Sequence, residues 1–284
     1  VASLLLTNGA AVNQANGDGT TPLLIACQKG RSEVASLLLT NGAAVNQAEG
    51  RGFTPLYAAC QEGHTEMVSL LLTNGAAVNQ ANGDGTTPLL IACQKGRSEV
   101  ASLLLTNGAA VNQAEGRGFT PLYAACQEGY ADVASLLLTN GAAVNQANGD
   151  GTTPLLIACQ KGRSEVASLL LTNGAAVNQA EGRGFTPLHV ACHVGSLALV
   201  QLLSSYSASR TLRNGKMAEE VAGHLGHSEV AAWLQASRLW STPLHHLDII
   251  DAKRGRALLR DGANLHAAAA VDGPTPLTLA RAQH

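Results

Sequence analysis

The tripeptide Thr-Pro-Leu recurs along this chain at a fixed interval of 33 residues. It begins at six successive positions: Thr21, Thr54, Thr87, Thr120, Thr153 and Thr186. Its surroundings repeat as well, because an Ala-Cys pair follows every copy at the same distance. Self-similarity at a period of this size is typical of a solenoid. The period therefore argues against doubly wound and barrel folds.

Each repeat begins with the pattern of a short helix. Thr21 suits the N-cap position, and Pro22 suits the first helical position, where a missing N–H costs nothing. Gly30 ends the helix. One narrow apolar face follows from the spacing i, i+3 and i+4 of Leu23, Ala26 and Cys27.

A second helix and an extended loop complete the repeat. The second helix begins at Ser32, and Asn41-Gly42 ends it with residues that tolerate left-handed geometry. Its expected apolar stripe consists of Val34, Leu37 and Leu38. The Gly- and Asn-rich stretch 14–20 has turn chemistry and predicts a projecting finger. Because no single unit can bury its apolar face alone, we expect neighbouring units to stack.

Six in-register copies of Gly-x-Thr-Pro-Leu, five of them followed by Leu-Leu-x-x-Gly-Ala, resemble the ankyrin repeat family. The resemblance covers almost the whole chain. It implies an all-α repeat solenoid of helix-turn-helix units with β-hairpin fingers, stacked with a concave groove. It also implies a role in protein–protein recognition and no catalytic activity, so we expect no enzyme here.

The repeats divide the chain as follows. A partial repeat covers 1–13, a degenerate repeat covers 212–240, and divergent ankyrin-like repeats cover 241–284, the last one incomplete. The six regular repeats are 14–46, 47–79, 80–112, 113–145, 146–178 and 179–211. The register breaks between Met217 and Thr242, which is the best candidate for an internal boundary. Both ends fall inside a unit, so we expect a longer protein.

Composition and charge exclude several classes of protein. The 284 residues are 46% hydrophobic with a formal net charge of −2, which argues against a disordered chain. This charge gives no electrostatic footprint for nucleic acid or an anionic membrane. No apolar run reaches the roughly 18 residues that a membrane helix needs. We therefore expect a monomeric protein that binds neither nucleic acid nor membrane.

Neither the cysteines nor the histidines predict a metal or cofactor site. The six cysteines (Cys27, Cys60, Cys93, Cys126, Cys159 and Cys192) share one position of the first helix, too far apart for disulfides. A row of evenly spaced thiols also cannot form a tetrahedral zinc site. His189 and His193 lack a third ligand, and the finger lacks the glutamate of a calcium loop. Free thiols favour an intracellular location, cytoplasmic or nuclear.

Within the array, the true period is 66 residues, because two unit types alternate. In ankyrin-like folds the fingertips and the first-helix surface line the groove, so the alternating positions there are the candidate partner contacts. They comprise Phe53, Phe119, Phe185, Tyr57, Tyr123, Arg51, Arg117, Arg183, Asp18, Asp84, Asp150, Lys29, Lys95, Lys161, Glu62 and Glu128. Aromatic and arginine side chains are enriched among the residues that dominate binding energy, so we expect the hot spots there. Alternatively, the charges only keep neighbouring units from repelling each other, and the phenylalanines only pack the fingers.

Three functions fit this sequence. The first is a scaffold or adaptor that binds a protein partner through its fingertips and first helices. The second is the substrate-recognition arm of a larger enzyme, such as a ubiquitin ligase, kinase or methyltransferase. The third is a spacer array whose specificity lies only in the C-terminal repeats.

Overall fold

The computed structural model describes residues 2–211, 217–237, 255–256, 258 and 275–276. These residues contain fifteen named helices: α1 Ala2–Thr7, α2 Pro22–Gln28, α3 Ser32–Thr40, α4 Pro55–Glu62, α5 Thr65–Thr73, α6 Pro88–Gln94, α7 Ser98–Thr106, α8 Pro121–Glu128, α9 Ala131–Thr139, α10 Pro154–Gln160, α11 Ser164–Thr172, α12 Pro187–Val194, α13 Leu197–Ser205, α14 Ala218–His224 and α15 Ser228–Ala236. The chain forms two compact units, an N-terminal unit Val1–Gly149 and a C-terminal unit Asp150–His284.

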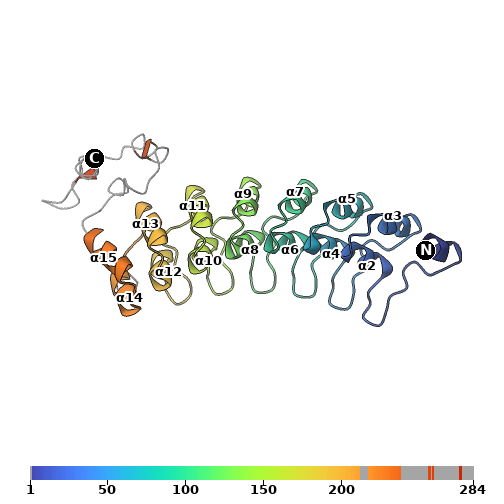
Figure 1. The fold of residues 1–284 in the computed structure, drawn as a ribbon, viewed down its shortest axis with the longest axis horizontal. Helices are drawn as coiled ribbons and strands as arrows, with labels where there is room; N and C mark the ends of the chain where they lie inside the picture. The colour runs from blue at the N-terminus through green and yellow to red at the C-terminus, as the bar shows by residue number, and fades with distance from the viewer. Residues whose placement is uncertain (1, 212–216, 238–254, 257, 259–274, 277–284) are drawn as a thin grey trace. The chain divides into compact units, whose positions relative to one another are not determined.

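In the N-terminal unit the helices form two rows (Figure 1). The first helices α2, α4, α6 and α8 pack each on the next, and so do the second helices α3, α5, α7 and α9. Each first helix also packs on the second helix of its own repeat. The loops that lead into the first helices project from that row as fingers. This is the stacked arrangement that the repeat period predicts.

The predicted capping of the first helices is confirmed. The hydroxyl of Thr54 accepts a hydrogen bond from the backbone N–H of Tyr57 at 3.1 Å, and Pro55 takes the first helical position. At the other end, Gly63 adopts the left-handed conformation with a φ of 84°. Both ends are therefore fixed by local sequence, which explains why helices this short persist.

The apolar stripe of the second helices differs slightly from the prediction. In α7, Val100, Ala101 and Leu104 are buried, whereas Leu103, the equivalent of the predicted Leu37, is only half-buried. Leu103 lies about 100° around the helix from Leu104. The small Ala101 takes its place on the contact face, because a methyl group lets neighbouring helices approach closely.

The fingers are tight turns, and no regular strand occurs in the described residues. Within one finger, the backbone N–H of Asn16 donates to the carbonyl of Thr20 at 3.1 Å. Between fingers, the N–H of Gly50 donates to the carbonyl of Asp18 at 3.0 Å. The same single bond recurs between the following fingers of this unit. One such bond at each step is too few for a β-ladder, so the expected hairpins appear as turns.

An asparagine after each second helix bridges neighbouring repeats. The Asn79 side chain donates to the carbonyl of Gly108 at 3.2 Å and accepts from the N–H of Ala110 at 2.8 Å. Asn13, Asn46 and Asn112 make the same pair of bonds in this unit. These bonds tie each repeat to the next outside the helices.

The C-terminal unit has the same two rows. Helices α10, α12 and α14 form one row, and α11 and α13 pack in the other with α15 after them. Met217 replaces the usual threonine before α14, and the carboxylate of Glu220 accepts a hydrogen bond from its N–H at 3.0 Å. The degenerate repeat thus keeps two helices. Nearly all of the predicted units in 241–284 lie outside the described residues.

Candidate binding surface

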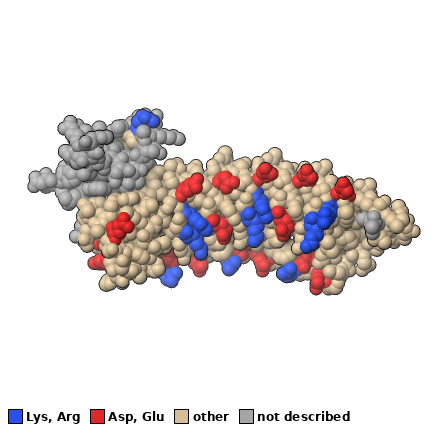
Figure 2. All heavy atoms as spheres, in the orientation of Figure 1, with Lys and Arg blue, Asp and Glu red and all other residues tan. Residues whose placement is uncertain are grey.

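The predicted contact residues of the N-terminal unit lie on the fingers and at the first helices. Four charged residues occupy successive fingers and are exposed: Asp18, Arg51, Asp84 and Arg117. Lys29 and Lys95 are exposed C-caps of α2 and α6. Figure 2 shows acidic and basic groups alternating over these helices. The predicted alternation of charge is therefore present at the surface.

The fingertip charges do not pair with one another in the described part of the unit. Instead, Nε of Arg51 lies 3.8 Å from the carboxylate of Glu49 in the same finger. Glu62 and Glu128 are half-buried and accept hydrogen bonds from their neighbours Gln61 and Gln127 at 2.9 and 2.8 Å. The exposed arginines and aspartates thus keep most of their polar atoms for solvent or a partner.

Each phenylalanine of this unit lies between an arginine and a tyrosine. The Phe53 ring stacks on the Tyr57 ring at 4.7 Å between centroids, with 13° between the planes. The Arg51 guanidinium covers the other side of Phe53 at 4.7 Å from its centroid. Arg117, Phe119 and Tyr123 repeat this three-layer stack, with distances of 4.6 and 4.7 Å. Cation–π contact holds each guanidinium in place at the surface.

The tyrosines support this stack from below. Tyr57 is only 6% exposed, so it presents little surface to a partner. Burial raises the pKa of Tyr57, Asp84 of the next finger raises it further, and Arg51 lowers it. The phenylalanines are half-buried. Arg51, with a side chain 79% exposed, is the outermost layer and the most available of the three.

Glutamates that we did not predict organise these fingers. The Glu49 carboxylate accepts from the N–H groups of Arg51 and Phe53 at 2.9 and 3.4 Å, and it also faces the Arg51 guanidinium. Glu115 and Glu181 hold their own fingers in the same way. The sequence signal was a Glu at the finger start of every second repeat, alternating with Asn.

In the C-terminal unit, the candidate contact residues Asp150, Lys161 and Arg183 are exposed. Phe185 differs from Phe53 and Phe119, because His189 stands where they have a tyrosine. His189 is fully buried, and its Nδ1 lies 2.6 Å from the Thr186 hydroxyl. Burial lowers the pKa of His189 to about 4, an effect that the Arg210 backbone partly opposes. Phe185 has no ring to stack on and is 37% exposed.

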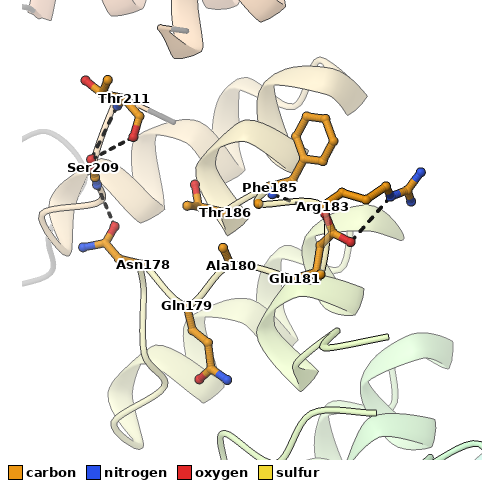
Figure 3. Close-up of a pocket in the computed structure, with 11 residues that line it drawn as sticks. Asn178, Gln179, Ala180, Glu181, Arg183, Phe185, Thr186, Ser209 and Thr211 are labelled. Carbon is orange, nitrogen blue, oxygen red and sulfur yellow. Dashed lines mark hydrogen bonds and ion pairs between the residues drawn. The ribbon is translucent and has the colours of Figure 1, made fainter. Parts of the chain in front are cut away.

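Two hollows border the Phe185 finger. One, of about 650 Å³, is lined by residues 178–186 with Ser209 and Thr211 (Figure 3). Its lining combines charged, polar and small residues of the finger with one aromatic residue, Phe185. Figure 3 places the Phe185 ring and the Arg183 side chain on the other side of the finger from Asn178 and Ser209. The second hollow, of about 380 Å³, includes Phe185 together with α10 and α12.

The described residues contain no group of side chains that could hold a metal ion. The six cysteines are buried and unpaired, as the spacing predicts. Burial raises the pKa of Cys27, Cys159 and Cys192 to about 12 and also raises that of the other three. In the described part of the chain, no helix is long and apolar enough to cross a membrane.

The ankyrin repeat model matches three times, over residues 1–82, 70–148 and 143–214. The chain therefore belongs to the ankyrin repeat family, as the repeated motifs predict. Among solved structures, it is similar to the ankyrin repeat domain of human ASB11, with 31% identity and a TM-score of 0.70. That match covers 76% of this chain and 97% of the other. No curated protein sequence matches. Ankyrin repeats are in general non-catalytic modules that bind proteins.

Proposed function

We propose that this protein is a scaffold or adaptor that binds a protein partner through its fingertips and first helices. The observation that carries the proposal is the Arg-Phe-Tyr stack, in which the guanidinium groups of Arg51 and Arg117 lie at the surface, 4.7 Å from the phenylalanine ring centroids. An arginine fixed in this way loses little side-chain entropy on binding. Arginine is also among the residues that most often dominate binding energy.

The regular spacing suits an extended partner. Two stacks recur two repeats apart, which corresponds to about 20 Å if stacked helices are about 10 Å apart. An aspartate on each intervening finger alternates with the arginines. A long helix or a segment with its own repeat could contact several fingers at once. The buried, unpaired cysteines support a reducing intracellular compartment as its location.

The test is a cross-linking pull-down from cell extract with the full chain and the variant R51E/R117E. The matched control is S69E/S135E, which adds acidic groups to exposed positions of the second helices in the same two repeats. We expect R51E/R117E to lose at least about 90% of the captured partner, because reversing a central charge both removes attraction and adds repulsion. The control should retain it.

Equal capture by both variants would contradict the proposal. A third variant that lacks 238–284 addresses the spacer function. If this truncation loses the partner while R51E/R117E keeps it, specificity lies at the C-terminal end, and the array serves as a spacer.

A further inference from the structure

The repeat 179–211 departs from its counterparts at four positions of its first helix. His189, Val190, His193 and Val194 stand where the repeat 113–145 has Tyr123, Ala124, Gln127 and Glu128. The repeat 47–79 agrees with the latter at all four. In a chain of near-identical units, this cluster is a local change of surface chemistry. It replaces an acidic group with an apolar one and removes the tyrosine beneath the phenylalanine.

Three of these four residues line a hollow of mixed polar and apolar character within the C-terminal unit. Without a tyrosine to stack on, Phe185 is 37% exposed, and Val194 is 40% exposed. Both line the 380 Å³ hollow with Leu156, Val190 and His193. A hollow of this size can take one large apolar side chain. Exposed apolar groups that cluster, instead of being scattered, indicate a contact site.

The charged side chains around the hollow differ in how far they are exposed to solvent. Its one carboxylate, on Glu181, has a side chain only 12% exposed and is held by the Phe185 N–H at 3.2 Å and by Nε of Arg183 at 3.6 Å. The Arg183 side chain, in contrast, is 85% exposed. His193 and Lys161, which follows the lining residue Gln160, are exposed too. Among the lining residues, Arg183 therefore presents its charge to solvent, while the one lining carboxylate is held within its own finger.

We propose that this hollow binds an acidic protein segment that inserts one bulky apolar side chain beside Phe185, Val190 and Val194. The inference rests on the proposed protein-binding function and names the partner chemistry for this repeat. The apolar side chain would fill the hollow, and acidic residues on either side would face Arg183 and Lys161. In the N-terminal unit, Glu62 and Glu128 stand at the position of Val194, so they would repel such a segment.

The experiment selects displayed random 12-residue peptides on the full chain and measures binding of the selected peptide by fluorescence anisotropy. The variant V194E restores the residue that the repeats 47–79 and 113–145 carry at this position, so we expect it to fold. The matched control I25E makes the same change at another exposed apolar position, which is 46% exposed in α2. A second variant, H189Y, restores the tyrosine on which Phe53 and Phe119 stack, so we expect it to cover the Phe185 ring that lines the hollow.

We expect the selected peptides to share a Leu, Ile, Phe or Trp flanked by Asp or Glu. V194E and H189Y should each weaken binding at least tenfold, whereas I25E should change it less than twofold. Peptides without this pattern, no selected peptide, or equal effects of V194E and I25E would overturn the inference. The proposed function would survive any of these results if R51E/R117E still loses the captured partner.

Discussion

A single replacement at residue 189 reorganises its neighbours. In the other regular repeats the threonine hydroxyl caps its helix by accepting a backbone N–H, as Thr54 does from Tyr57. At Thr186 that hydrogen bond is absent, and the hydroxyl pairs with the His189 ring. One buried imidazole thus accounts for two losses: the threonine side-chain cap of α12 and the tyrosine ring on which the phenylalanine stacks in the repeats 47–79 and 113–145.

His189 predicts a specific dependence of stability on pH. Its pKa falls from 6.5 to about 4 on folding, so the folded state keeps the ring neutral where the unfolded chain is protonated. Stability is therefore lost as pH falls from 6.5 to 4, with no further loss below. The shift corresponds to at most about 3 kcal/mol.

Urea unfolding of the full chain and of H189Y between pH 7.5 and 3.5 measures this effect. The carboxylates are common to both proteins, so the difference between the two curves isolates the histidine. We expect the wild type to lose about 2–3 kcal/mol more than H189Y across that window. Parallel curves would show that His189 keeps an ordinary pKa.

At the level of elements, close backbone approach holds the fingers together. Gly52 has a φ of +86°, and a Cβ added there would lie 2.8 Å from the backbone nitrogen of Gly83 in the next finger. Backbone atoms cannot move aside as a side chain can. Gly75 has nearly the same φ, +82°, but nothing lies within 4 Å of the added Cβ. Comparing Gly52 with Gly75 therefore separates the cost of the left-handed backbone conformation from the cost of steric crowding by the next finger.

We therefore expect Gly52→Ala to destabilise the protein more than Gly75→Ala. A non-glycine residue in the left-handed region costs about 1–2 kcal/mol, and this should be the whole effect at Gly75. At Gly52 the crowding should add about 1–3 kcal/mol. Urea denaturation of both variants provides the measurement, and equal losses would mean that the fingers separate freely.

The sequence predicts some of these local features and not others. The caps and the left-handed glycines follow from residue type and spacing, because each depends on neighbours within one turn of helix. The burial of the cysteines follows from the period, which places each of them at the same position of a stacked helix. The stack of Arg51 on Phe53 and the role of Glu49 were not predicted. They depend on how the finger folds back, which spacing along the chain does not specify.

At the scale of the molecule, the repetition makes the interfaces between successive repeats equivalent to one another. Within the N-terminal unit, each repeat of one type packs against a repeat of the other type. Removing 47–112 would join Asn46 to Gln113, and the same Asn-Gln pair joins the repeats in the wild type. Every remaining interface keeps its natural type. Solenoid stability is approximately a sum over units and their nearest-neighbour interfaces.

We expect the chain without 47–112 to fold with unchanged helicity per residue and a smaller urea m-value, in proportion to the surface removed. Removing only 47–79 would bring Asp18 next to Asp84 and Lys29 next to Lys95. Its stability should rise with salt by up to about 1 kcal/mol, because salt screens exposed like charges. Circular dichroism and urea unfolding at low and high salt compare the two, and an identical salt response would contradict the role of alternation.

The sequence alone determined the repeat and the helix boundaries, since these depend on periodic spacing and on capping residues a few positions away. It also located the alternating charges. It did not determine the buried face of the first helices: α6 buries Pro88–Cys93 in succession, not one narrow face, because it packs against α4, α7 and α8. Only the tertiary structure decided which residues a partner can reach. It buried Tyr57 beneath Phe53, placed Arg51 outermost and left Phe185 exposed beside Val194. These outcomes depend on contacts between fingers and helices. There, His189 in place of a tyrosine leaves Phe185 without the ring that covers Phe53 and Phe119.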